Sequence, residues 1–163
     1  QSLNYQIDAT SVEHFAENTM VDSALAVYVQ QAREKNIPID VKIDTPSTFS
    51  AEIDFSLLLC NLLENAIHAE EHEAEDARGI RVRVRTAGDS LFLSVENRCS
   101  TPVKFSANGL PKREKHSDEH GYGTLSIEQF TQKYGAECFT EQKDGYFRIL
   151  LHLPLPVNSN NQS

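Results

Sequence analysis

Two asparagines, Asn61 and Asn65, stand one helical turn apart in the otherwise apolar stretch 59–69. At about 100° per residue they lie about 40° apart around a helix axis, with Glu64 and His68 beside them. The aliphatic residues of this stretch fall on the other side of the helix: Leu59, Leu62, Leu63, Ala66 and Ile67. The polar front therefore faces water, a metal ion or a ligand; the alternative is a pair of solvated surface amides.

A second segment, 120–127, reads His-Gly-Tyr-Gly-Thr-Leu-Ser-Ile and leads into a helical pattern. Gly121 and Gly123 at the start of a helix let the backbone approach a ligand closely and turn its N–H groups toward an anion. A glycine pair alone often serves only as a turn. Together with the amide-bearing helix, it predicts binding of nucleotide phosphates. The inward positions predicted for the following helix are Leu125, Ile127, Phe130 and Tyr134.

On these segments the chain resembles the ATP-binding catalytic domain of sensor histidine kinases, in the gyrase–Hsp90–histidine kinase–MutL superfamily. Residues 61–66, Asn-Leu-Leu-Glu-Asn-Ala, match that family's N-box, and residues 120–127 match its second glycine-rich G-box. The leading segment 15–37 and the closing segment 147–154 look like the quorum-sensing and peptide-sensing receptor kinase branch. The likeness implies the Bergerat ATP-binding fold, an α+β two-layer sandwich with helices on one face of a mixed sheet.

The resemblance implies that Asn65 binds the Mg²⁺ ion that bridges the phosphates of ATP, with Asn61 as a second candidate ligand. Mg²⁺ prefers hard oxygen ligands and keeps several waters, so one or two protein oxygens suffice. Asn61 stands where ATP-hydrolysing relatives carry a glutamate, and an amide is no general base near neutral pH. Phosphoryl transfer to a partner side chain is therefore favoured over hydrolysis. The implied ATP-binding set is Asn61, Asn65, His68, Asn97, Lys112, Arg113, His120, Gly121, Tyr122, Gly123, Thr124 and Leu125.

The adenine end departs from the family pattern, because the chain has no D-x-G-x-G run. Asn97, at the equivalent strand end, is expected to accept a hydrogen bond from the adenine amine; the alternative is a turn residue. His68 takes the place of a basic residue that the family often carries after the N-box. Residues 98–119 lack hydrophobic periodicity and are expected to form the ATP lid, with Lys112 and Arg113 near the triphosphate. A loop kept soluble by its charges is the alternative.

Composition indicates one domain, expected at 1–155, followed by a polar tail at 156–163. A net charge of −9 argues against sequence-independent binding to nucleic acid. Cys60, Cys99 and Cys138 have no metal-ligand spacing and favour reduced thiols in the cytosol. No apolar run reaches the roughly 18 residues of a membrane span. The chain begins at Gln1 without an initiator methionine, which suggests a portion of a larger protein. The resemblance implies a monomeric cytoplasmic domain of a membrane-anchored sensor.

Hydrophobic periodicity also predicts the elements that position these residues. A leading helix is expected from Val12 to about Lys35, and the motif helix is expected to be capped by Asp54 and to reach about Ala74. A second helix is expected at 123–133. The predicted strands cover 37–43, 79–85, 90–96, 136–140 and 146–153.

No histidine of this chain stands in the acceptor pattern of histidine kinases, and His14 is expected to be structural or a surface residue. The resemblance therefore implies that the phosphoacceptor lies on a dimerising helical domain of the same full-length protein, and that a response regulator is a further partner. The alternative is a non-catalytic regulatory module of the same fold with weak or no nucleotide binding.

Overall fold

The computed structural model describes residues 13–103 and 124–156. One five-stranded sheet has the order β1-β2-β3-β5-β4, with β1 parallel to β2 and the other neighbours antiparallel. The elements are α2 (Thr19–Glu34), β1 (Ile39–Ile43), α3 (Glu52–Glu71), the 3₁₀ helix η1 (Glu75–Ala77), β2 (Ile80–Ala87), β3 (Ser90–Arg98), α4 (Thr124–Tyr134), β4 (Glu137–Lys143) and β5 (Tyr146–Pro154).

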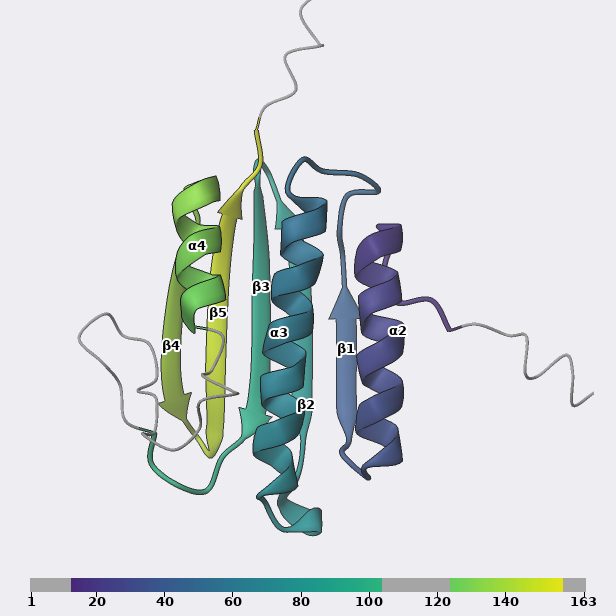
Figure 1. Cartoon of the computed structure of the whole chain (residues 1–163), viewed down its shortest axis with the longest axis vertical. Helices are drawn as coiled ribbons and strands as arrows, with labels where there is room; N and C mark the ends of the chain where they lie inside the picture. The colour runs from purple at the N-terminus through teal and green to yellow at the C-terminus, as the bar shows by residue number, and fades with distance from the viewer. Residues whose placement is uncertain (1–12, 104–123, 157–163) are drawn as a thin grey trace, which may run out of the picture.

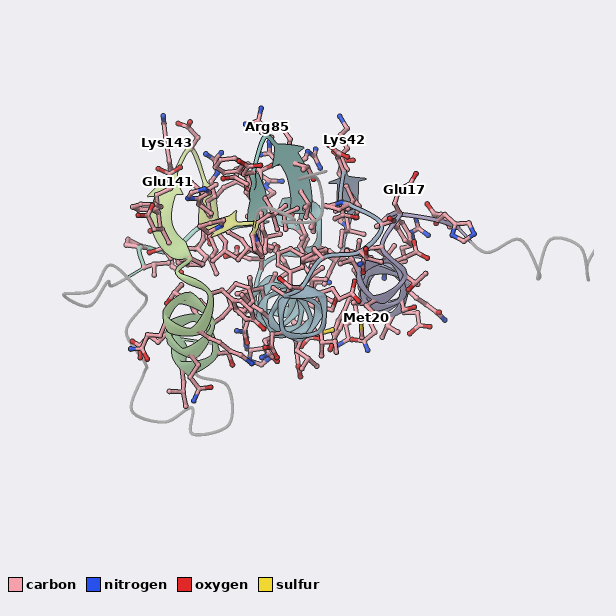
Figure 2. The ribbon with its side chains drawn as sticks, turned by 90° about the horizontal axis from the view of Figure 1, so that it is seen from above. Glu17, Met20, Lys42, Arg85, Glu141 and Lys143 are labelled. Carbon is pink, nitrogen blue, oxygen red and sulfur yellow. The ribbon has the colours of Figure 1, made fainter. Side chains whose placement is uncertain are left out.

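The described helices form one layer and the sheet forms the other, which confirms the predicted two-layer architecture. In Figure 1, α3 lies over the centre of the sheet, between α2 and α4. Figure 2 shows Lys42, Arg85 and Lys143 on the face of the sheet that points away from the helices. The helix-facing side chains of β2 are Ile80, Val82 and Val84, all buried as their alternation with arginines predicted. None of the described helices is long and apolar enough to cross a membrane.

The core lies between α3 and the sheet. The aliphatic stripe of α3 is buried as predicted, and Phe55 from its first turns is completely buried. The Phe55 ring packs edge-on against Phe49 with centroids 5.6 Å apart, and lies 6.4 Å from the Phe130 ring of α4. This aromatic cluster fixes the start of α3 against α4 and so determines which sides of the two helices meet.

The leading helix begins at Thr19, so its predicted start at Val12 was wrong. Asn18 is the N-cap, because its side-chain oxygen accepts from the backbone N–H groups of Met20 at 3.1 Å and Val21 at 3.0 Å. Residues 13–18 form no helix, and the carboxylate of Asp22 accepts from the backbone N–H of Phe15 at 2.6 Å. Capping by the Asn18 side chain thus makes the helix begin later than the apolar periodicity predicted.

The motif helix also differs from the prediction at both ends. It begins at Glu52 with Ala51 at the N-cap position, so Asp54 does not cap it. Instead, the Asp54 carboxylate accepts hydrogen bonds from Lys133 Nζ at 2.8 Å and from the Tyr134 hydroxyl, both on α4. The helix ends at Glu71 rather than near residue 74, and η1 follows.

Along α4, the predicted burial is confirmed for Ile127 and Phe130, whereas Tyr134 is only half-buried. Leu125 is 56% exposed, so its predicted inward position was wrong. At about 100° per residue it lies about 160° around α4 from the buried Ile127, on the solvent side of the helix. Strand β4 continues to Lys143 instead of ending at Thr140, because it pairs with β5 up to the hairpin turn.

Candidate functional site

The polar front of α3 lies beside the first turn of α4. The Nδ2 atom of Asn61 donates a hydrogen bond to Ser126 Oγ at 3.1 Å. One side of α3 therefore meets α4 twice, here and through the contact of Asp54 with Lys133. Of the second predicted segment, residues 124–127 are described, and Ser126 among them meets the amide-bearing helix. Ser126 was not among the predicted residues, although it directly follows Thr124 and Leu125.

Asn65 follows Asn61 by one turn, is half-buried, and projects about 40° away around the helix. Asn61 donates a hydrogen bond through its nitrogen, and none of the described residues donates a hydrogen bond to its Oδ1. Amide oxygens are hard ligands of the kind that Mg²⁺ accepts alongside several waters. In the described part of the chain, no group of three or more His, Cys, Asp or Glu forms a metal cluster. The amide oxygens of Asn61 and Asn65 fit a cation that takes few protein ligands.

His68 lies on the exposed surface of α3. Its Nδ1 is 3.9 Å from the Glu71 carboxylate, and its ring meets the His72 ring edge-on at 5.0 Å. Together with Asn65 it lines a cavity of about 130 Å³ between α2 and α3. Glu64 on the same helix is exposed.

Asn97 faces the helix layer near the end of β3 and is only 7% exposed. Successive side chains of a strand alternate between its two faces, so Asn97 lies on the same face as the buried Leu93 and Val95. It pairs with Ile80 of the neighbouring strand β2. Its Nδ2 donates to the backbone oxygen of Arg98 at 3.3 Å. The strand thus holds this amide between the sheet and α3, and its contact with adenine stays a prediction.

A buried glutamate, Glu70, lies behind Asn97. The side chain is 0% exposed, and its Oε2 accepts from the backbone N–H of Gly79 at 3.3 Å. Its Oε1 has no hydrogen-bond partner among the described residues. Burial raises the pKa of Glu70 to about 7, against the opposing effects of the Gly79 N–H and the Asn97 side chain, which favour the ionised form.

Sequence reasoning missed Glu70. It belongs to the charged run 70–73, which looks like a solvated helix end. A signal was present, because Glu70 follows Ala66 by four residues and Leu63 by seven. Helical periodicity therefore puts it on the buried stripe of α3.

Six predicted residues lie outside the part of the chain that the structure describes: Lys112, Arg113, His120, Gly121, Tyr122 and Gly123. Thr124 is the first residue of α4. Leu125 is exposed beside Ser126. The structure thus brings Asn61 to the start of α4, whereas Asn65 lines the cavity between α2 and α3.

Comparison with known proteins finds the same architecture in histidine kinases. The catalytic domain of histidine kinase ThkA, in a nucleotide-free form, matches with a TM-score of 0.67 and 17% identity, over 83% of this chain and 90% of that one. The mycobacterial sensor histidine kinase MprB matches with a TM-score of 0.59 and 15% identity, over 83% and 93%. ThkA in complex with the response regulator protein TrrA gives 0.67 and 15%, over 94% of this chain and 46% of that one. No match was found among curated proteins.

Residues 51–154 match the family model described as the GHKL domain. This range contains the amide-bearing front of α3, the end of β3 and the whole of α4. The match covers more than half of the 163-residue chain, and the solved structures agree with it in fold. The chain therefore belongs to the GHKL domain family and has the fold of histidine kinase catalytic domains.

Proposed function

We propose that this chain binds Mg-ATP between α3 and α4 and is the phosphoryl-donor domain of a two-component sensor histidine kinase. The observation that carries the proposal is the hydrogen bond of 3.1 Å between Asn61 and Ser126. It brings the polar front of the motif helix against the N-terminal turn of α4. The first backbone N–H groups of a helix have no partner within the helix, and together with the positive end of the helix dipole they suit phosphate.

Phosphoryl transfer depends mainly on positioning and charge neutralisation. In this proposal Asn65 and Asn61 bind Mg²⁺ through their amide oxygens, and the start of α4 with Thr124 and Leu125 binds the phosphates. When bound, Mg²⁺ neutralises phosphate charge. Asn97 binds the adenine amine. We also assign to the nucleotide site His68, which lines the small cavity between α2 and α3 together with Asn65.

The remaining site residues are proposed from the resemblance. We assign Lys112 and Arg113 to a lid over the triphosphate, and His120, Gly121, Tyr122 and Gly123 to the phosphate loop. In the sequence these four residues directly precede Thr124, the first residue of α4. A basic pair near the phosphates is consistent with the needs of a triphosphate in a chain of net charge −9.

The nature of Asn61 favours transfer over hydrolysis. Its amide cannot take a proton from water near neutral pH. Glu64, the carboxylate nearest in sequence, is exposed rather than held at the site. We therefore propose that the γ-phosphate goes to a histidine on a separate dimerisation domain of the same full-length protein.

The partners follow from that assignment. A response regulator is proposed as the downstream partner, and the complex of ThkA with the response regulator protein TrrA supports this choice. We further propose that residues 1–155 act as one monomeric cytoplasmic domain of a membrane-anchored sensor in the quorum- and peptide-sensing branch, with 156–163 as a tail. Nucleic acid is not a proposed partner.

Calorimetric titration of the chain with a non-hydrolysable ATP analogue and Mg²⁺ tests the proposal. We expect binding that depends on Mg²⁺ and that falls at least tenfold in the Asn65→Ala variant, with the melting temperature unchanged. Glu64→Ala, an exposed neighbour on the same helix, is the matched control and should bind normally. Absence of both heat and thermal shift in the unaltered chain would favour the non-catalytic module, and steady ATP hydrolysis would favour a hydrolase.

A further inference from the structure

The amide of Asn97 has two different ends, and only one can face a ligand at a time. Its nitrogen is a donor and its oxygen is an acceptor. Adenine presents an amine donor at the ring position where guanine presents a carbonyl acceptor. The orientation of the Asn97 amide therefore decides which purine the site accepts.

The described contacts of Asn97 lie on its nitrogen side. Nδ2 donates to the backbone oxygen of Arg98 at 3.3 Å, and no described group donates to Oδ1. The carboxylate of Glu70 lies beside the amide and favours the same orientation, since an ionised carboxylate accepts hydrogen bonds and cannot donate them. Glu70 itself is 0% exposed and is fixed by the Gly79 N–H at 3.3 Å.

Glu70 has a free acceptor where the Asn97 amide needs one. Its Oε1 is buried and without a partner among the described residues. A buried, unpaired carboxylate oxygen is costly unless a donor satisfies it. An amide nitrogen turned toward α3 is the side-chain donor available there, and this leaves the amide oxygen for the opposite side.

We propose that Glu70 is a positioning residue that holds the Asn97 amide with its nitrogen toward α3 and its oxygen toward the nucleotide, so that the site selects adenine over guanine. This inference rests on the proposed function and adds the origin of its base specificity. Loss of the carboxylate's charge removes the preference. A protonated Glu70 donates to Oδ1, and the turned amide then presents its nitrogen to a guanine carbonyl.

The selection is therefore sensitive to pH. The groups that face Glu70 are the Gly79 N–H, the Asn97 amide, the nearby positive charge of Arg98 and the negative charge of Glu73. The pKa of Glu70 is raised to about 7 mainly by burial, so the ionised form dominates above that pH and the protonated form below it. The preference for ATP should be largest near pH 8 and should decline as the pH falls below 7.

The test compares dissociation constants for Mg-ATP and Mg-GTP at pH 8 and pH 6. We expect the unaltered chain to prefer ATP at least tenfold at pH 8. Glu70→Gln should lose most of that preference, because glutamine can donate to Oδ1 and turn the amide. The double variant Glu70→Gln with Asn97→Asp should regain it, since an aspartate accepts from the adenine amine whichever oxygen faces it. Glu64→Gln, exposed on the same helix, should match the unaltered chain.

A second readout needs no nucleotide. In ¹H–¹⁵N spectra the side-chain NH₂ signal of Asn97 should move with pH through the titration of Glu70, and should not move in Glu70→Gln. A folded Glu70→Gln variant that keeps the full preference for ATP overturns the inference, as does an Asn97 signal that is insensitive to pH. Failure of the unaltered chain to bind any purine nucleotide overturns the proposed function as well, so the two failures are distinguishable.

Discussion

Replacing Glu70 by glutamine should change how the stability of the fold depends on pH. In the unfolded chain this carboxyl ionises near its ordinary pKa of 4.5, whereas burial in the folded chain raises the pKa to about 7. Between these values the unfolded state has lost a proton that the folded state keeps, so raising the pH destabilises the fold. With about 1.36 kcal/mol per pKa unit, the full effect is about 3 kcal/mol, and it is complete above pH 7.

Glutamine has a similar shape and does not ionise, so this dependence disappears in the variant. The free energy of unfolding of Glu70→Gln, minus that of the unaltered chain, should rise by about 2.5 kcal/mol between pH 5 and pH 8. Urea unfolding followed by circular dichroism at four pH values measures this difference. Glu64→Gln is the control, because its side chain is exposed. A Glu70 difference that stays constant or falls as the pH rises would refute the account of a buried carboxyl with a raised pKa.

Three further outcomes are expected. Leu63→Ala, in a completely buried position of α3, should cost about 2–5 kcal/mol in urea unfolding, whereas Leu57→Ala, 60% exposed on the same helix, should cost under about 0.5 kcal/mol. Equal losses would contradict the assigned helix faces. Asp54→Asn should lower the melting temperature slightly, because the hydrogen bond from Lys133 lowers the pKa of this carboxyl, and the gap between the unaltered chain and the variant should close in acid as Asp54 protonates. Gly123→Val should weaken nucleotide affinity at unchanged melting temperature, since a side chain there obstructs the backbone approach to phosphate; normal affinity in calorimetry would make the glycine only a turn residue.

Much of the fold could be predicted because burial leaves a periodic trace in the sequence. Alternation of arginine with Ile80, Val82 and Val84 gave the strand and its inward face, and both are observed. The aliphatic stripe of α3 likewise predicted which side of the helix meets the sheet. Periodicity is local information, and these features depend on one element at a time.

The wrong predictions concern side-chain contacts and helix faces that depend on the folded structure. Asp54 has the residue type and approximate position of an N-cap, but it bonds to Lys133, which lies far away in sequence and close in space. The helix start at Thr19 depends on capping by Asn18, which competes with apolar periodicity. Leu125 was predicted to face inward, but it lies on the side of α4 opposite the buried Ile127.

The candidate site was predicted in part for the same reason. The polar front of α3 is visible in spacing alone, and so is the glycine pair before α4. The contact between Asn61 and Ser126 joins residues 65 positions apart, and a single sequence gives no sign of that pairing. Glu70 was missed because it belongs to a run of charged residues, which is typical of a solvated helix end. Its helical position nevertheless places it on the buried side of α3.

The central claim is that the front of α3 and the start of α4 form one nucleotide site, and chemical-shift mapping of ¹⁵N-labelled protein with a magnesium-bound ATP analogue tests it most directly. We expect the side-chain amide signals of Asn61 and Asn65 and the backbone signal of Ser126 to move together, with a single shared affinity. Phe139, exposed on the opposite face of the sheet, should stay unchanged. Shifts that leave the two helices untouched, or that gather around Phe139, would contradict it.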